Sequence, residues 1–312
     1  MNKHYFSVQG KHIYLNGRQF LARGLRCSNA LYSNESTKDL INNLDLYNYH
    51  GINTISVYFM GNRFSDFTGY NEDGSLKSEY KERMGNIIEA ADERGMLVIV
   101  GCLYWGQTKA KYQGWKQKEA NAAIKNTVLW LSEKNYFNCL IDVDNEGMAQ
   151  SMAGFDDREL VLAGKSANPK ILIATNYSGL PPQEADLGLH FSEINPENPY
   201  IESEGTPHWA PGGYWGRWSR KFDSINSYKR DDTYWNYINI GVYTEEMKRD
   251  CLEMSKKYFD NGWGYLLAST WLQAVPPFGP NHSPGGDGSI EHPGIRWFLE
   301  FLRSKFGPYS SG

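Results

Sequence analysis

The sequence has little of what marks several specialised protein classes. Its four cysteines lie far apart and form no CxxC pair, so neither a structural zinc site nor a disulfide framework is expected. Its 32 lysines and arginines do not exceed its 36 aspartates and glutamates, so it lacks the basic surplus typical of nucleic-acid-binding proteins. No run approaches the roughly 18 apolar residues of a membrane span. We therefore expect a soluble protein with neither nucleic acid nor a membrane as its partner.

Signals for location and for two common chemistries are also missing. The opening MNKHYFSVQG has no apolar core of a signal peptide, so the chain as it stands remains where it is made. A signal removed beforehand leaves the same sequence, and the localisation (cytoplasmic, periplasmic or secreted) is therefore open. The chain contains no glycine-rich phosphate loop and no GxSxG nucleophile motif.

What the sequence does contain is material for a large core. Hydrophobic residues make up 40% of the chain and aromatic residues 14%, which excludes disorder. No internal repeat or linker divides the sequence, and we expect one domain over residues 1–312.

Short apolar runs alternate with amphipathic stretches along the chain. They predict strands at 20–26, 53–59, 97–103, 137–144, 170–175, 187–191, 200–204 and 264–270, and helices at 37–49, 79–94, 116–133, 244–261 and 295–304. Thr37 is the expected N-cap of the first helix. Eight strands in order, with helices between most of them, predict an α/β fold, the (β/α)8 TIM barrel.

Two features modify this barrel. Residues 1–17 predict an N-terminal β-hairpin that closes the barrel bottom, with Asn16 and Gly17 as a turn signal. Only about ten residues separate the fifth, sixth and seventh strands, whereas a parallel crossover usually needs a dozen or more. The fifth and sixth helices are therefore expected to be short, with one turn at most.

Polar and aromatic side chains gather where the predicted strands end, which is where catalytic groups of such barrels lie. From the first strand to the eighth they are Arg26, Ser28 and Asn29; Tyr58 and Asn62; Tyr104, Trp105 and Gln107; Asp142, Asp144, Asn145 and Glu146; Asn176 and Tyr177; His190, Ser192 and Glu193; Glu202 and Glu204; Trp271 and Gln273. The expected site is rich in carboxylates and rings, with amides between them.

Several of these segments resemble the clan A glycoside hydrolases, which include cellulase-like and β-galactosidase-like enzymes. FSVQGKHIYLNGRQFLARGL at 6–25 resembles their entry hairpin and first strand, and DVDNEG at 142–147 resembles their Asn-Glu motif on strand four. YIESEG at 200–205 is similar to their strand-seven glutamate segment, and STWLQA at 269–274 to their strand-eight tryptophan segment. The resemblance covers essentially the whole chain.

The resemblance implies a role for each matching residue. Glu146 would be the acid/base and Glu204 the nucleophile of a retaining enzyme, in which a proton donor and a carboxylate flank the sugar. Asn145 would bind the sugar 2-hydroxyl, and Trp271 would form the floor of the cleavage subsite. No cofactor and no metal is implied.

Glu202 is a rival nucleophile, because residues 202 and 204 share a strand face. Glu204 is favoured because it lies nearer the strand end and because Gly205 beside it gives a ligand close approach.

The chain departs from the clan in three respects, which indicates a divergent family. Many members have an arginine on strand two, where this chain has Ser56 and Tyr58. Gly147 follows the acid, where cellulase-like families have proline, and the stretch from Glu146 to Glu204 is short.

Other candidates allow two interpretations each. His190 is either a core histidine or a site residue that faces two carboxylates. Asp142 and Asp144 either belong to the site or lie inside the barrel, satisfied by arginine and lysine. One further group is read as a polar loop rather than a metal site, since it lacks helical HxxxH spacing: His282, Asp287, Glu291 and His292.

The long aromatic segment 206–243 is expected to form a wall of the cleft, with rings that stack on sugar units. A satellite core beneath the loop is the alternative. The candidate substrate-binding residues are Asn145, His190, Trp271, Tyr104, Trp105, Asn176, Tyr177, Glu202, Trp209, Trp215 and Trp218.

The sequence thus predicts a retaining glycoside hydrolase that cleaves a β-linked oligo- or polysaccharide. The alternatives are a barrel that binds glycans without hydrolysis and a metal-dependent sugar isomerase or epimerase. The sugar, the linkage, endo or exo action and the oligomeric state are left open.

Overall fold

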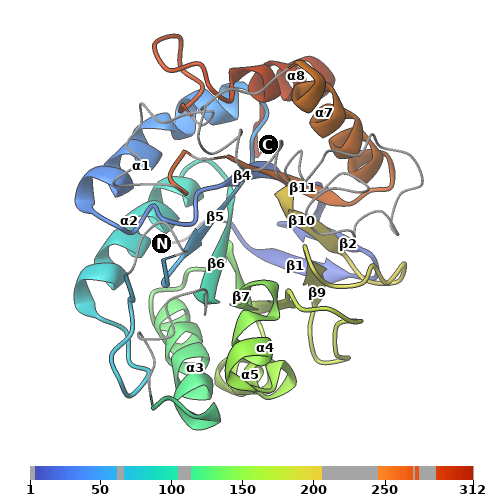
Figure 1. The fold of residues 1–312 in the computed structure, drawn as a ribbon. Coiled ribbons are helices and arrows are strands. Elements are labelled where there is room, and N and C mark those ends of the chain that lie inside the picture. The colour runs from blue at the N-terminus through green and yellow to red at the C-terminus, as the bar shows by residue number, and fades with distance from the viewer. Residues whose placement is uncertain are drawn as a thin grey trace.

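The computed structural model describes residues 4–61, 67–104, 114–205, 245–269, 271–273 and 286–311, with the backbone alone at 246, 247 and 250. Eight parallel strands form a closed barrel with helices around its outside (Figure 1). The barrel strands are β4 (Arg23–Arg26), β5 (Thr54–Tyr58), β6 (Leu97–Leu103), β7 (Cys139–Asp144), β8 (Leu172–Thr175), β9 (Leu187–Leu189), β10 (Tyr200–Gly205) and β11 (Gly264–Ala268). Strands consecutive in the chain pair with one another, and β11 pairs with β4 to close the ring. The predicted TIM barrel is confirmed.

The predicted helices are present with small shifts of their ends. They are α1 (Asn34–Tyr49), α2 (Ser78–Asp92), α3 (Gln117–Glu133), α7 (Glu245–Asp260) and α8 (Arg296–Phe306). The cap of α1 was predicted wrongly. Ser33 is the N-cap and accepts from the backbone N–H of Ser36 at 3.1 Å, whereas Thr37 lies inside the helix and donates to the carbonyl of Ala30. Serine and threonine both serve as caps, so composition alone did not separate the two positions.

Two helices that we did not predict fill the connection from β7 to β8. They are α4 (Met148–Ala153) and α5 (Asp157–Ala167). Asp156 caps α5, because its side chain accepts from the backbone N–H groups of the first turn. Gly164 brings this helix close to the barrel, since a Cβ there would lie 2.4 Å from Ile173.

The two short connections contain turns instead of helices. Every residue between β8 and β10 is described, and no helix lies among them. This side of the barrel, yellow in Figure 1, is therefore not covered by helices of its own. The fifth and sixth helices were expected to be short. They are absent from these two connections, because the segments have too few residues for a helical crossover.

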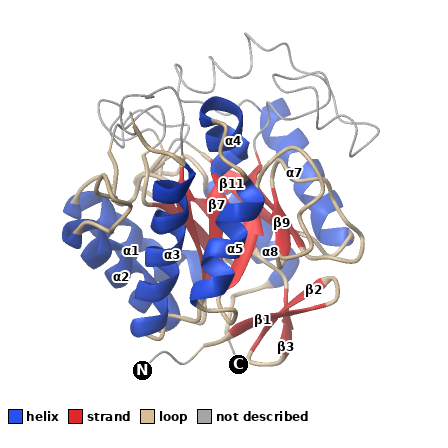
Figure 2. Ribbon diagram, turned by 90° about the horizontal axis from the view of Figure 1, so that it is seen from below, coloured by secondary structure: helices blue, strands red, loops and turns tan. Residues whose placement is uncertain are grey.

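The N-terminal hairpin is part of a three-stranded antiparallel sheet, β1 (Phe6–Gln9), β2 (His12–Leu15) and β3 (Arg18–Phe20). Asn16 and Gly17 both have positive φ (49° and 82°), as a tight turn between β2 and β3 requires. The strand predicted at 20–26 is thus divided between β3 and β4. Figure 2 shows this sheet at the end of the barrel opposite α4.

The N-terminal sheet closes the lower half of the barrel by apolar packing. Its buried side chains join one cluster with residues that point into the barrel: Phe6, Ile13, Leu15, Phe20, Ala22, Leu97, Ile99, Leu140, Leu172, Ala174, Leu187, Leu189, Ile201 and Leu266. Polar side chains that point inward therefore occur toward the opposite, C-terminal end of the strands. No helix in the described ranges is long and apolar enough to cross a membrane.

Candidate active site

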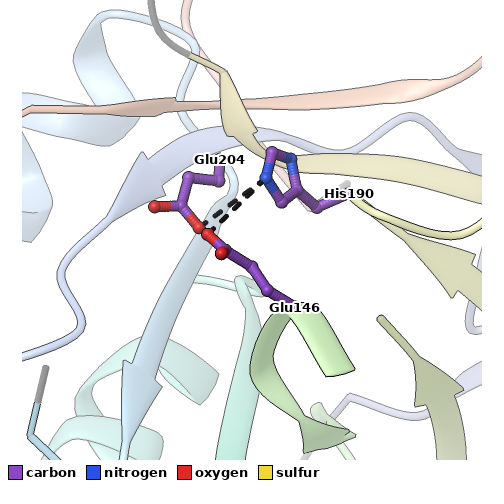
Figure 3. A group of neighbouring side chains, drawn as sticks. All are labelled: Glu146, His190 and Glu204. Carbon is purple, nitrogen blue, oxygen red and sulfur yellow. Dashed lines mark ion pairs between the residues drawn. The ribbon is translucent and has the colours of Figure 1, made fainter. Parts of the chain in front are cut away.

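Three side chains at the ends of three different strands meet at the C-terminal end of the barrel. Nε2 of His190, just after β9, lies 3.9 Å from Oε1 of Glu146 and 3.9 Å from Oε2 of Glu204 (Figure 3). The three ligand atoms all lie within 4.8 Å of one another. The Glu146 and Glu204 side chains are 9% and 12% exposed, so both are shielded but accessible.

Glu146 is positioned by a turn at the end of β7. Glu146 and Gly147 both have left-handed backbone conformations, with φ of 55° and 60°. Asp144 stabilises this turn, because its carboxylate accepts from the backbone N–H groups of Ala149 and Gln150 in α4. Proline requires φ near −65°, so the proline of cellulase-like families does not fit at position 147.

Arg26 connects three strands across the barrel mouth. From the end of β4, its Nη2 lies 3.3 Å from Oε2 of Glu204 and donates to Oδ1 of Asn145 at 2.9 Å. Its Nη1 donates to the hydroxyl of Tyr58 at 3.1 Å. Burial by itself lowers the pKa of Arg26, but the negative charges of Glu204 and Glu146 and the nearby tyrosines outweigh it, so the pKa is raised. The guanidinium therefore stays charged.

A second polar chain lies behind Arg26. Tyr58 donates to Oδ2 of Asp142 at 2.6 Å, and Asn176 donates to the same oxygen at 3.1 Å. Burial raises the pKa of Asp142, and these two hydrogen bonds oppose that effect. Gly101 makes room for the arrangement, since a Cβ there would lie 1.9 Å from the Tyr58 ring.

Glu202 points away from the gap between Glu146 and Glu204. Its Oε1 pairs with Nδ1 of His190, and its Oε2 accepts from the hydroxyl of Tyr258 at 3.0 Å. The β10–β11 register shifts between Glu202 and Gly205, which accounts for the different surroundings of the two glutamates. Glu202 and Glu204 contact opposite nitrogens of one imidazole ring.

Most described members of the predicted set lie around this cluster. Asn145 and Asn176 are fully buried beside Arg26 and Asp142. Tyr104 is 8% exposed and contacts the edge of the Tyr58 ring.

For two other predicted residues the described contacts are with groups other than the glutamates. Tyr177 donates to the carbonyl of Leu180. Trp271 is 7% exposed and packs edge-on against Tyr47. Some residues of the predicted set lie outside the described residues: Trp105, Trp209, Trp215, Trp218, His282 and the segment 206–243.

Two expectations need correction. Gly205 was expected to give a ligand close approach, but a Cβ there would lie 2.1 Å from the Tyr265 ring, which occupies that space. The hydrogen bonds of Asp142 and Asp144 come from tyrosine, asparagine and backbone groups, not from arginine and lysine.

The sequence analysis placed Arg26 and Tyr58 at strand ends without assigning them a role, and it did not single out Tyr258. The available signal for Arg26 was an arginine at the end of an otherwise apolar strand, FLARGLR. Among the described residues, Glu146, His190 and Glu204 form the group that could hold a metal ion. Arg26 opposes a cation there, because its guanidinium already contacts Oε2 of Glu204.

No protein-family model and no curated protein matches the sequence, but solved structures match the fold. An exo-β-1,4-mannosidase from Opitutaceae bacterium strain TAV5 is 15% identical, with a TM-score of 0.57 over 93% of this chain. This chain covers only 60% of that protein. A β-glucanase from Saccharophagus degradans in complex with cellotetraose is 14% identical, with a TM-score of 0.57 over 97% of this chain and 94% of that one. A β-mannanase from the blue mussel Mytilus edulis is 11% identical, with a TM-score of 0.54 over 99% of both chains.

The chain has the fold of these glycoside hydrolases. Within this barrel, the cluster of Glu146, His190 and Glu204 lies at the ends of the fourth, sixth and seventh strands.

Proposed function

We propose that this chain is a clan A glycoside hydrolase that cleaves β-glycosidic bonds with retention of anomeric configuration. Glu146 is the acid/base, Glu204 is the nucleophile, and the substrate is a β-linked oligo- or polysaccharide. The observation that carries the proposal is the close pair of carboxylates at the C-terminal end of the barrel, whose facing oxygens lie within 4.8 Å.

The separation of the two carboxylates favours retention. Retaining glycosidases have carboxyl groups about 5–5.5 Å apart, so that one of them reaches the anomeric carbon directly. Inverting enzymes need roughly 6.5–9.5 Å to admit a water molecule. The Glu146–Glu204 spacing supports direct attack by a glutamate.

The surroundings of the two glutamates support their different roles. Glu204 contacts the guanidinium of Arg26, which neutralises the carboxylate of a nucleophile before attack. Glu146 lies on a turn rather than in a strand, from which its side chain approaches the same gap from the side of β7. Glu202 is 3% exposed and is held by His190 and Tyr258, so it has no path to an anomeric carbon.

Asn145 has the free donor that a sugar hydroxyl needs. Arg26 holds its Oδ1, while its buried Nδ2 has no hydrogen-bond partner among the described residues. A buried donor without a partner is costly, and a substrate hydroxyl relieves that cost. This supports the role of Asn145 in binding the 2-hydroxyl next to the cleaved bond.

Azide rescue tests the two glutamates separately. In Glu204→Gly, azide fills the space of the nucleophile and should give a glycosyl azide of inverted configuration. In Glu146→Ala, a dinitrophenyl glycoside needs no proton donor, so the intermediate still forms and azide should give a product of retained configuration. General acid–base catalysis contributes typically 10²–10⁴-fold, and natural substrates of Glu146→Ala should lose about that factor.

Four results would overturn parts of this proposal. An inverted azide product from Glu202→Gly alone would move the nucleophile to Glu202. Inversion at the anomeric carbon in wild-type products, followed by NMR, would exclude double displacement. Saturable glycan binding without hydrolysis would favour a binding protein, and activity that requires Mn²⁺ or Zn²⁺ after chelation would favour an isomerase-type enzyme.

A further inference from the structure

Glu202 is a buried carboxylate surrounded by hydrogen-bond donors. Its Oε1 contacts Nδ1 of His190 and accepts from the backbone N–H of Glu204 at 3.1 Å. Its Oε2 accepts from the hydroxyl of Tyr258 at 3.0 Å. Because an ionised carboxylate offers only acceptors, the charged form of Glu202 satisfies all these donors. Glu202 thereby holds both His190 and the backbone of Glu204.

His190 is fixed by its backbone as well as by its ring. Its φ of 24° is unusual for a residue other than glycine, and its carbonyl accepts from the hydroxyl of Tyr200 at 2.5 Å. Strained backbone of this kind persists only where the surrounding contacts enforce it. With Nδ1 directed at Glu202, Nε2 faces both Glu146 and Glu204 at the same distance, 3.9 Å.

The proposed reaction moves one negative charge between these two carboxyls. In the first step, Glu204 forms a bond to the anomeric carbon while the bond from that carbon to the glycosidic oxygen breaks. Glu146 gives its proton to the departing oxygen. Glu204 becomes a neutral ester and Glu146 becomes a carboxylate, and water reverses both changes in the second step.

We propose that Glu202 keeps His190 in its imidazolium form, and that this cation stabilises the negative charge equally on Glu204 and on Glu146 throughout the cycle. This proposal rests on the proposed function. The equal distances mean that the attraction of the imidazolium for the charge changes little when the charge moves. Arg26 cannot do this alone, since its 3.3 Å contact is with Glu204.

The groups that face His190 favour its charged form. Both ring nitrogens face carboxylates, Glu202 at Nδ1 and the two catalytic glutamates at Nε2. A neutral ring protonated at Nδ1 would turn the lone pair of Nε2 toward Glu204, whose ionised carboxylate can only accept. Arg26 is the opposing cation, and its nearest carboxylate is Glu204, while Asp142 adds a further acidic group nearby.

The first experiment measures the charge of His190 and needs no substrate. The chain has seven histidines, so the signals of ¹⁵N-labelled histidine rings can be assigned by comparison with His190→Gln. Both ring nitrogens of His190 should be protonated at pH 7 in the wild type. In Glu202→Gln the ring should become neutral, whereas Glu202→Asp, which retains the charge, should preserve the imidazolium. A neutral His190 in the wild type would overturn the proposal.

The second experiment measures whether Glu202 acts through His190. We expect kcat/KM to fall about tenfold in His190→Gln, because without the cation the close pair of carboxyls holds one ionised member less readily at pH 7. Glu202→Gln should lose a similar factor, and the double variant should be no slower than His190→Gln. Glu197→Gln, at an exposed glutamate in the loop that follows β9 and His190, is the matched control and should be unchanged.

The two experiments separate this inference from the proposed function. Losses in the double variant that multiply would show that Glu202 acts independently of His190, and the inference would then be wrong. If the wild type hydrolyses no glycoside, the proposed function fails while the NMR measurement still decides the charge of His190. Thermal midpoints of all variants identify any loss that comes from unfolding.

Discussion

Arg26 and Glu204 form an ion pair across the barrel mouth, with Nη2 of the arginine 3.3 Å from Oε2 of the glutamate. Their strands are not neighbours, because β11 lies between β4 and β10 in the barrel. The same guanidinium nitrogen donates to Asn145 at the end of β7. One fully buried side chain thus sets the relative positions of Glu204 and the segment that carries Glu146.

The first prediction follows from this double contact. Arg26→Lys retains a positive charge but loses the planar fork that reaches Glu204, Tyr58 and Asn145 together. Misplacement of a catalytic group by about 1 Å can cost 10²-fold, and we expect a fall of that order in kcat on aryl glycosides.

Arg23→Lys is the matched control, at the other end of the same strand. Arg23 is the first residue of β4 and Arg26 the last, so the two lie at opposite ends of the barrel. The guanidinium of Arg23 stacks on Phe306, with its Cζ 4.5 Å from the ring centroid. This variant should lower the thermal midpoint more than kcat. Equal kcat in Arg26→Lys and wild type would show that the fork plays no part in catalysis.

The second prediction concerns the free donor of Asn145. If Nδ2 binds the sugar 2-hydroxyl, Asn145→Ala and removal of that hydroxyl from the substrate delete the same contact. Each change alone should lower kcat/KM by about 10²-fold, within the several kcal/mol assigned to such contacts. Combining them should cost little more than either one. Independent losses in this cycle of steady-state measurements would place the 2-hydroxyl elsewhere.

The third prediction concerns the space at Gly101. In Gly101→Ala the new methyl group would meet the Tyr58 ring at 1.9 Å and displace it from Arg26 and Asp142. We expect a loss of about 1–3 kcal/mol in the free energy of unfolding, together with reduced kcat. In Gly85→Ala, within α2, the methyl group would meet only the Tyr136 side chain closely, at 3.2 Å, so urea titration should show a much smaller effect.

The fourth prediction is a pH dependence of stability at Asp157. Burial, and then the charge of Asp142, raise the pKa of Asp157 to about 7 in the fold, from 3.8. The folded state thus holds a proton that the unfolded chain releases earlier. The stabilisation is complete below about pH 4 and is lost as pH rises through 7.

Asp157→Asn removes this titration, because the amide resembles the protonated acid. Its free energy of unfolding should match that of wild type near pH 4 and exceed it by roughly 4 kcal/mol at pH 8, since one pKa unit corresponds to about 1.4 kcal/mol. Urea midpoints at the two pH values provide the measurement, with exposed Glu72→Gln as the control. A difference between wild type and Asp157→Asn that does not vary with pH would contradict the assignment.

The sequence by itself determined the order of the barrel strands and of five helices around them, because these depend on local patterns; it did not show α4 and α5. The run of apolar residues at 97–103 predicts β6 with the bounds that the structure has, and amphipathic spacing predicts α3 to within one residue. The small number of residues between β8 and β10 was also evident from the sequence, and it predicted short connections there because a helical crossover needs a minimum chain length. The positions of Glu146 and Glu204 at strand ends follow from the same order.

Only the tertiary structure decided which side chains meet. Arg26 and Asn145 are 119 residues apart in sequence and hydrogen-bond because the barrel closes. The different surroundings of Glu202 and Glu204 depend on the register shift of β10, which the YIESEG segment does not encode locally. Local propensity is a property of a segment, whereas pairing across a closed barrel depends on the register of every strand between the partners.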